Sequence, residues 1–182
     1  MKKLIFSGLL IAAVLMAMAG CARVPYEPVF DSGAVEISTF DSGLWLKGGE
    51  VFIKNLYPGY TGEMEFEVGN GIKDDVVREV HISVAPEDDK DLGDWEQLPA
   101  EYYSWFEVDA PVFVLQPGES QIVTVTVRMP EDADYSQKRA RCELLVLGWV
   151  VVGTVITDTG ELANEVGNVP IGIASEWYIE TY

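Results

Sequence analysis

Residues 112–128 read VFVLQPGESQIVTVTVR, and this stretch decides the fold. Two runs of apolar and β-branched residues flank a short turn. Pro117 presets the backbone of that turn, and Gly118 supplies the positive φ that it needs. In the second run, residues 121–128, polar and apolar side chains alternate over four periods. Such alternation is typical of a strand with one wet face and one face in a core, so the stretch predicts two strands joined by a tight turn.

The same period-two pattern recurs along the chain, between short turn signals rich in glycine and proline. The further strands predicted in this way are residues 35–38, 44–46, 50–54, 63–68, 76–84, 141–156 and 171–182. Residues 85–111 form a long, irregular connection that is rich in acidic and aromatic side chains. No segment shows a sustained 3.6-residue period. The pattern predicts an all-β fold, an immunoglobulin-like two-sheet antiparallel β-sandwich, with a closed barrel as the alternative.

The most apolar of these segments, residues 141–156, contains Gly148 and Gly153 among β-branched residues. It is shorter than the roughly 20 residues that a membrane-spanning helix requires. Glycines among valines also favour strands over a helix. We expect a core strand, a turn or bulge, and part of another strand.

Leu115 to Ser120, followed by an alternating strand and by Pro130, Glu131 and Asp132, resembles the prokaryotic immunoglobulin-like or fibronectin-like domains of bacterial and archaeal surface proteins. Residues 53–59 with 68–70 are similar to the early strand pair of those domains. The resemblance covers residues 50–150. The apolar stretch after Gly148 departs from the pattern of those domains, and we expect it to form an extra hairpin. It implies a sandwich that binds, spaces or braces, without shared catalytic residues.

The first 20 residues have the composition of a secretory signal peptide. Lys2 and Lys3 precede an apolar run over residues 4–18 and small residues before Cys21. Residues 18–21 resemble the lipobox of bacterial lipoproteins, in which the cysteine is diacylated and becomes the new N-terminus. The resemblance implies a lipid on Cys21; the alternative is an ordinary signal cleavage near Ala19, with Cys21 incidental.

These observations divide the chain into three parts. Residues 1–20 are expected to be the signal peptide, residues 21–34 a proline-containing tether, and residues 35–182 the β-sandwich. The predicted location is the cell envelope, extracytoplasmic and anchored to a membrane through the lipid. The chain has 30 acidic and 12 basic residues and a formal charge of -18. That charge disfavours nucleic acid and anionic lipid head groups as partners.

Residues suited to catalysis are scarce. His81 is the only histidine and falls on the wet face of a predicted strand, and there is no G-x-S-x-G motif. Cys142 lies in a predicted core strand, where a thiol is inert, and one histidine with one cysteine cannot build the usual zinc sites. Suitably spaced carboxylate pairs carry no specificity among so many acidic residues. The sequence therefore predicts that the protein is not an enzyme.

An acidic run in the long connection suggests calcium as the one candidate cofactor. Its carboxylates are the oxygen ligands that calcium prefers, and the candidate ligands are Asp88, Asp89, Asp91 and Asp94. Gly93 and Ala100 occupy positions where an EF-hand has ligands. Acidic loops of this kind are usually only solvated, so we expect no cofactor and keep calcium as an alternative.

Aromatic side chains are concentrated in the second half of the same connection. The candidate ligand-binding residues are Trp95, Tyr102, Tyr103 and Trp105. Exposed rings of this kind stack on sugars or anchor protein partners, whereas buried ones would close one end of the core. The preferred prediction is a structural or protein-interaction module of the cell envelope, and the alternative is a carbohydrate-binding module. The expected partners are the membrane, through the lipid, and an envelope protein or a surface glycan.

Overall fold

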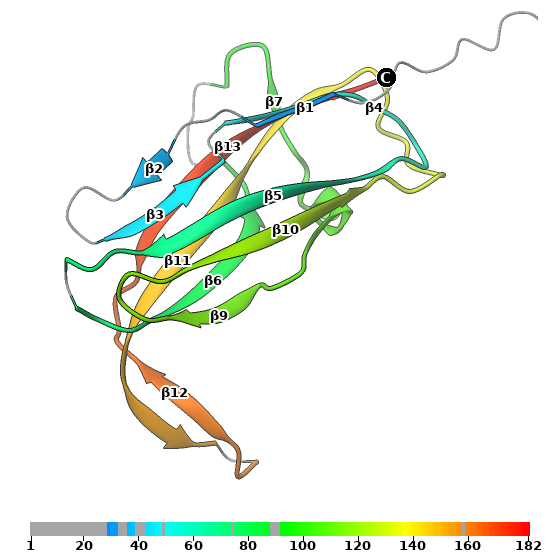
Figure 1. The fold of residues 1–182 in the computed structure, drawn as a ribbon. Coiled ribbons are helices and arrows are strands. Elements are labelled where there is room, and N and C mark those ends of the chain that lie inside the picture. The colour runs from blue at the N-terminus through cyan, green and yellow to red at the C-terminus, as the bar shows by residue number, and fades with distance from the viewer. Residues whose placement is uncertain are drawn as a thin grey trace, which may run out of the picture.

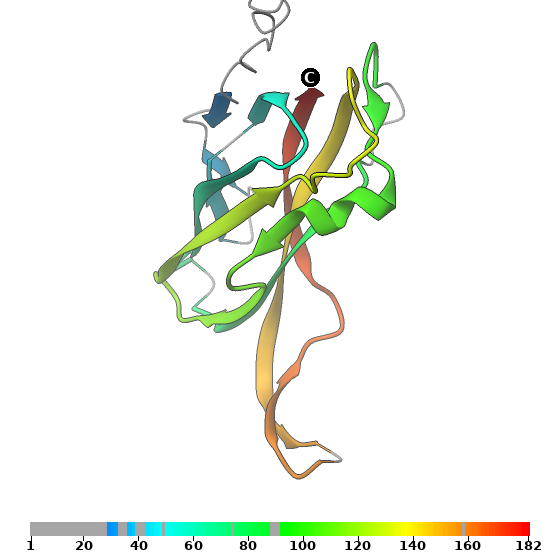
Figure 2. The same cartoon turned by 90° about the vertical axis from the view of Figure 1, so that its right-hand side faces the viewer.

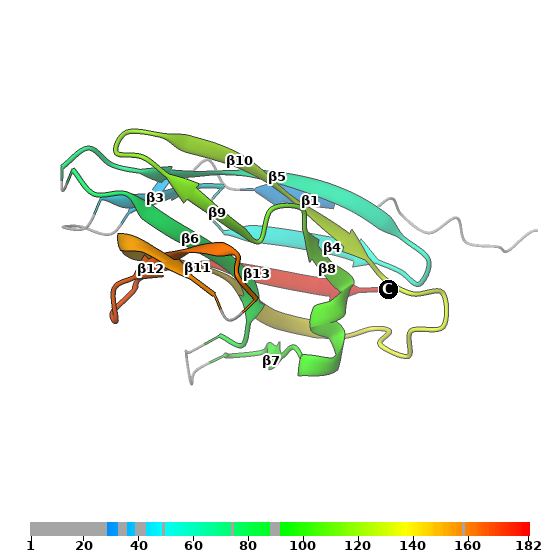
Figure 3. The same cartoon turned by 90° about the horizontal axis from the view of Figure 1, so that it is seen from below.

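The computed structural model describes residues 29–32, 36–38, 43–48, 50–73, 75–87, 92–157 and 159–182. Most of these residues belong to strands, which form two sheets (Figure 1). Seen from below, the two sheets lie face to face as separate layers (Figure 3). The all-β sandwich predicted from the alternating runs is therefore confirmed, and the closed barrel does not form.

The larger, eight-stranded sheet contains the longest strand of the described chain, β11 (Arg139–Ile156). On one side β11 pairs with β13 (Ile171–Thr181), and on the other with β6 (Arg78–Ala85). The sheet is completed by β1 (Val29–Ser32), β4 (Val51–Leu56), β7 (Glu96–Gln97), β9 (Val112–Leu115) and β12 (Leu162–Val166). Most neighbours are antiparallel, but β4 with β13 and β7 with β11 are parallel.

The smaller sheet has five strands, in the order β2-β3-β5-β10-β8. Their bounds are β2 (Glu36–Ser38), β3 (Leu44–Lys47), β5 (Thr61–Asn70), β8 (Phe106–Val108) and β10 (Ser120–Arg128). A short 3-10 helix, η1 (Ala100–Trp105), precedes β8. The connection expected to be irregular over residues 85–111 thus contains η1 and two short strands.

The turn at residues 116–119 joins the two sheets. β9 pairs with β6 in the larger sheet, while β10 pairs with β5 in the smaller one. Gly118 has a φ of 82°, the left-handed conformation expected from the sequence. Its N–H donates to the carbonyl of Asn70 at 2.7 Å. The two predicted strands are confirmed, and the turn between them closes one end of the sandwich.

The core lies between the sheets, where alternate side chains meet. Trp177 on β13 is fully buried, with its ring 5.6 Å from that of Phe66 on β5 and 5.4 Å from that of Phe106. From β10, the buried side chains are those of Val123, Val125 and Val127, as the alternation predicts. Burying a side chain of this size contributes roughly 1.5–3 kcal/mol, so this layer supplies the main stabilisation of the domain.

Two boundaries differ from those expected. β1 lies inside the stretch assigned to the tether and pairs with β4, so the sheet begins at Val29 and not at residue 35. The irregularity expected within residues 141–156 is a register shift between Val151 and Gly153, and it does not divide β11, which runs past Gly148 as one strand. Gly148 lacks a positive φ and fits an ordinary strand. The extra hairpin expected after Gly148 is confirmed, and β12 forms its second strand.

Candidate functional site

The hairpin at the far end of β11 projects from the sandwich. Residues 151–156 of β11 pair with β12 to form a two-stranded ribbon that stands clear of both sheets (Figure 2). The ribbon is closed by a tight turn, in which the N–H of Thr157 donates to the carbonyl of Glu161 at 2.8 Å. We call residues 151–166 the arm. A register shift between Val151 and Gly153 marks the point where the arm leaves the sheet.

The arm exposes large apolar side chains. Val152 is 63% exposed, Ile156 72% and Leu162 77%. Ile156 and Leu162 are direct cross-strand partners, so their side chains share one face of the ribbon. Isolated two-stranded ribbons are marginally stable in water, and contiguous exposed apolar surface marks interaction sites. The arm is therefore the part of the described chain best suited to contact a partner.

A polar brace fixes the base of the arm to the sheet. Asn164 on β12 donates from Nδ2 to Oε2 of Glu79 on β6 at 2.8 Å. The other oxygen of Glu79 lies 2.8 Å from Nε2 of His81, whose ring packs 4.7 Å from that of Trp149. The hydrogen bonds from His81 and then from Asn164 hold the pKa of Glu79 below its ordinary value. The brace gives the arm a defined direction, and it places His81 on the outer face that the alternation predicts.

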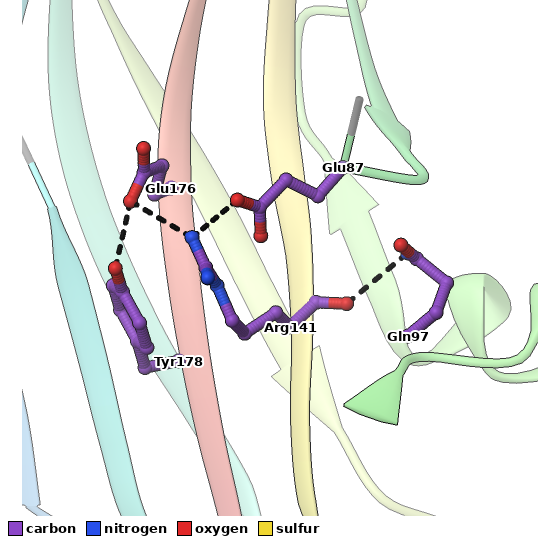
Figure 4. A network of polar contacts seen from close by, with 5 residues as sticks. All are labelled: Glu87, Gln97, Arg141, Glu176 and Tyr178. Carbon is purple, nitrogen blue, oxygen red and sulfur yellow. Dashed lines mark hydrogen bonds and ion pairs between the residues drawn. The ribbon is translucent and has the colours of Figure 1, made fainter. Parts of the chain in front are cut away.

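A second polar cluster lies on the outer face of the larger sheet (Figure 4). Arg141 on β11 donates from Nη2 to Oε1 of Glu87 and, at 3.1 Å, to Oε2 of Glu176 on β13. Tyr178 donates from its hydroxyl to the same oxygen of Glu176 at 2.7 Å, and Gln97 donates from Nε2 to the carbonyl of Arg141 at 3.2 Å. Burial, followed by the contact with Glu176, raises the pKa of Tyr178 to about 12.

This cluster has a structural explanation. The side chains of Arg141 and Glu87 are 9% and 4% exposed, so the ion pair is withdrawn from water. The guanidinium of Arg141 also lies 4.8 Å above the ring of Tyr178, which stacks on Phe52 at 4.6 Å. The cluster therefore attaches Glu87 and β7, from the connection between β6 and η1, to the outer face of the sheet.

The four aromatic residues proposed as a ligand platform do not lie together. Trp95 packs 5.1 Å from Tyr178 on the outer face, beneath the guanidinium of Arg139. Tyr102 and Trp105 pack instead against Tyr135, at 4.7 and 5.9 Å between ring centroids, and against each other at 4.6 Å. Trp105 is only 3% exposed because η1 turns it into the core, so its indole has no face available to a sugar. Tyr103 is partly buried against the same core.

The other predicted sites are only partly described. Cys21 and the signal peptide lie outside the described residues, as do Asp88, Asp89 and Asp91 of the calcium hypothesis. Within the described ranges, no group of three or more histidine, cysteine or acidic side chains could hold a metal ion. No helix in the described part of the chain is long and apolar enough to cross a membrane.

Cys142 is fully buried on β11. Burial, together with the nearby carboxylates of Glu87 and Glu143, raises the pKa of its thiol well above the ordinary value. The thiolate is the reactive form of cysteine. Cys142 is therefore an inert core residue, as its place in an apolar strand predicts.

Comparison with known proteins found only distant structural similarities. No family model matches the chain, and no curated protein matches it. Among solved structures, the chain is similar to the ASH / PapD-like domain of human CEP192, with 12% identity, a TM-score of 0.46, and coverage of 80% of this chain and 90% of that one.

The chain is also similar to the E. coli chaperone DraB, with 19% identity and a TM-score of 0.44. That match covers 76% of this chain and 54% of the chaperone. A family 123 glycoside hydrolase from Clostridium perfringens matches over only 22% of its length, with 6% identity and a TM-score of 0.39. The strand pairing within the structure itself defines the fold as a two-sheet β-sandwich.

Proposed function

We propose that this protein is a lipid-anchored, extracytoplasmic interaction module of the cell envelope that presents its arm to a protein partner. The observation that carries the proposal is the exposed apolar surface on one face of the arm, formed by Val152, Ile156 and Leu162, with the exposed Val155 on the opposite face. These side chains extend from a rigid sandwich and are fixed at their base by the contact of Asn164 with Glu79. A surface of this kind favours a protein partner over a sugar, which needs exposed rings side by side.

The positions of Val29 and the arm at opposite ends of the sandwich support the same proposal. Val29 pairs with Lys54, and the N–H of Tyr182 donates to the carbonyl of Leu56 at 2.8 Å, so both lie at one end of the sandwich. β11 begins near that end and runs to the arm, roughly 55 Å away at about 3.3 Å per residue. Figure 1 shows the C-terminus and the arm at opposite ends. A lipid on Cys21 would therefore leave the arm pointing away from the membrane.

The anchor is tested by expressing the full chain in a bacterial host and separating membranes from soluble fractions. Wild type should sediment with membranes and carry a diacylglyceryl mass on Cys21, whereas Cys21→Ser should be released. Cys142→Ser is the matched control and should stay with the membranes, because Cys142 lies in the core. Equal release of wild type and Cys21→Ser would show that the protein is not lipid-anchored.

The interaction is tested by placing a photocrosslinking residue at Leu162, in the same host. Ile122 on β10 is the matched control, because it is exposed and apolar but lies away from the arm. A discrete protein adduct from Leu162, absent from Ile122, is the expected result. The same adducts from both positions, or none from Leu162, would contradict an interaction through the arm.

A further inference from the structure

The arm has one strand edge that continues directly from a paired strand of the sheet. β6 pairs with β11 as far as Val150, and the N–H of Val151 then donates to the carbonyl of Val77 at 2.9 Å. Beyond that point, β12 lies on one side of residues 152–156, and no described strand pairs on the other side. A strand placed there would lie in line with β6 and extend the larger sheet.

The two edges of the arm differ in their chemistry. β12 carries Glu165 and follows Glu161, and charged side chains are a common protection of edge strands against unwanted pairing. Residues 150–156 on β11 contain no charged residue and no proline. They are also mostly β-branched, which suits pairing in a sheet. The β11 edge is therefore the unprotected edge of the arm.

We propose that the β11 edge of the arm, over residues 152–156, binds an extended strand of a partner protein in which apolar and basic residues alternate. This inference rests on the proposed interaction function and specifies its partner. Main-chain hydrogen bonds would supply the pairing. The exposed side chains of Val152 and Ile156 lie on one face of the arm and would contact the apolar residues of the added strand, whereas Val155 on the opposite face would lie beside its basic residues.

The charge around the arm selects a basic partner. Residues 150–170 contain three acidic residues and no lysine, arginine or histidine. Glu79, at the end of β6 beside the open edge, adds a further carboxylate, and the whole chain has a formal charge of -18. A second copy of this chain would bring like charges together, whereas a basic strand is attracted and steered to the site.

The test uses three labelled synthetic peptides and the full chain carrying Cys21→Ser, which leaves the arm unchanged. The first peptide alternates lysine and valine; the second has the same composition with the lysines and valines in separate blocks; the third alternates glutamate and valine. Fluorescence anisotropy should show binding of the first peptide only. Equal binding of the block peptide would overturn the inference, because net charge alone would then explain the affinity.

The edge is identified with two matched substitutions. Val155 and Ala163 are cross-strand partners on one face, so Val155→Lys and Ala163→Lys place the same charge on opposite strands of the arm. Val155→Lys should weaken binding of the lysine–valine peptide by about tenfold or more. Ala163→Lys should weaken that binding by about twofold at most. Bound peptide should slow amide exchange in residues 152–156. A larger effect of Ala163→Lys, or protection confined to β12, would overturn the assignment of the edge.

Two further outcomes separate this inference from the proposed function. Absence of peptide binding, with a persistent crosslink from Leu162, would reject strand addition and leave the interaction module standing. Absence of both would reject both. Concentration-dependent self-association in sedimentation, abolished by Val155→Lys, would identify a second copy as the occupant and overturn the basic partner.

Discussion

The two halves of β11 are both rich in apolar residues and have opposite surroundings. In the inner half, over Arg139 to Gly148, β13 flanks the strand on one side and β7 and then β6 on the other. The smaller sheet covers one face, so Leu144 and Val146 are fully buried. In the outer half, over residues 151–156, only β12 flanks the strand, and Val152 and Ile156 are exposed. The comparison teaches that burial along a strand is decided by the elements that the topology places opposite it, and not by residue type.

The largest effect is expected from truncating the inner half. Leu144→Ala removes a fully buried side chain from β11 and should lower the free energy of unfolding by about 3 kcal/mol, because it leaves a cavity. Leu162→Ala makes the same change in the exposed arm and should alter the free energy of unfolding by no more than about 0.5 kcal/mol. Urea denaturation of both variants measures the difference, and similar costs would refute the contrast between the halves.

A smaller loss is expected from Arg141, at the covered end of the inner half. Arg141→Ala removes the guanidinium that contacts the buried carboxylate of Glu87, and should cost about 2 kcal/mol. Arg139→Ala is the control, since its ion pair with Glu180 is exposed and contributes about 1 kcal/mol or less. Denaturation at neutral pH should rank the two variants in this order; the reverse order would show that the buried pair is not the stronger contact.

In the outer half, the brace should affect local and not global stability. Asn164→Ala removes the hydrogen bond to Glu79 and should speed amide exchange in the arm by roughly fivefold, equivalent to about 1 kcal/mol. Global unfolding should be unchanged. Asn168→Ala, which alters an exposed amide beside the arm, should leave exchange as in wild type. Equal effects of the two substitutions would show that the brace does not hold the arm.

The smallest effect concerns pH. The folded chain holds the phenolic proton of Tyr178 up to about pH 12, because its pKa is raised, whereas the unfolded chain loses it near the ordinary value of 10.0. The associated stability is present below pH 10.0 and is lost as the pH rises towards 12. Wild type should therefore lose more stability over this range than Tyr178→Phe in denaturation measured against pH. Parallel losses would contradict the raised pKa.

Features with a local cause could be predicted from the sequence. The alternation around Val123 and Val125 gave the correct core face, and Pro117 with Gly118 gave the correct turn. The irregularity expected within residues 141–156 occurs as a register shift between Val151 and Gly153, whereas Gly148 lies in continuous strand because its neighbours on both sides are paired. Which residues line the core can thus be deduced from periodicity, whereas the length of a strand depends on its partners.

The functional surface depends on contacts that are distant in sequence. Residues 151–156 have the composition of a core strand, and their exposure results from where the opposite sheet ends. The pairing of Glu87 with Arg141 likewise joins residues 54 positions apart. For Trp105 the sequence left two alternatives, an exposed ring or a ring that closes the core, and burial was preferred. A short 3-10 helix leaves no clear period, so the direction of the indole could not be deduced.

The placement of the arm opposite Val29 also has a mechanical consequence. Tension between a membrane-tethered N-terminus and a partner held by the arm would act along the strands, from β1 through β4 and β13 to β11. Hydrogen bonds between these strands lie across that direction, so they would resist together in shear and would not open one after another. Under such a load the sandwich would behave as a stiff connector that transmits pulling force between its two ends while remaining folded.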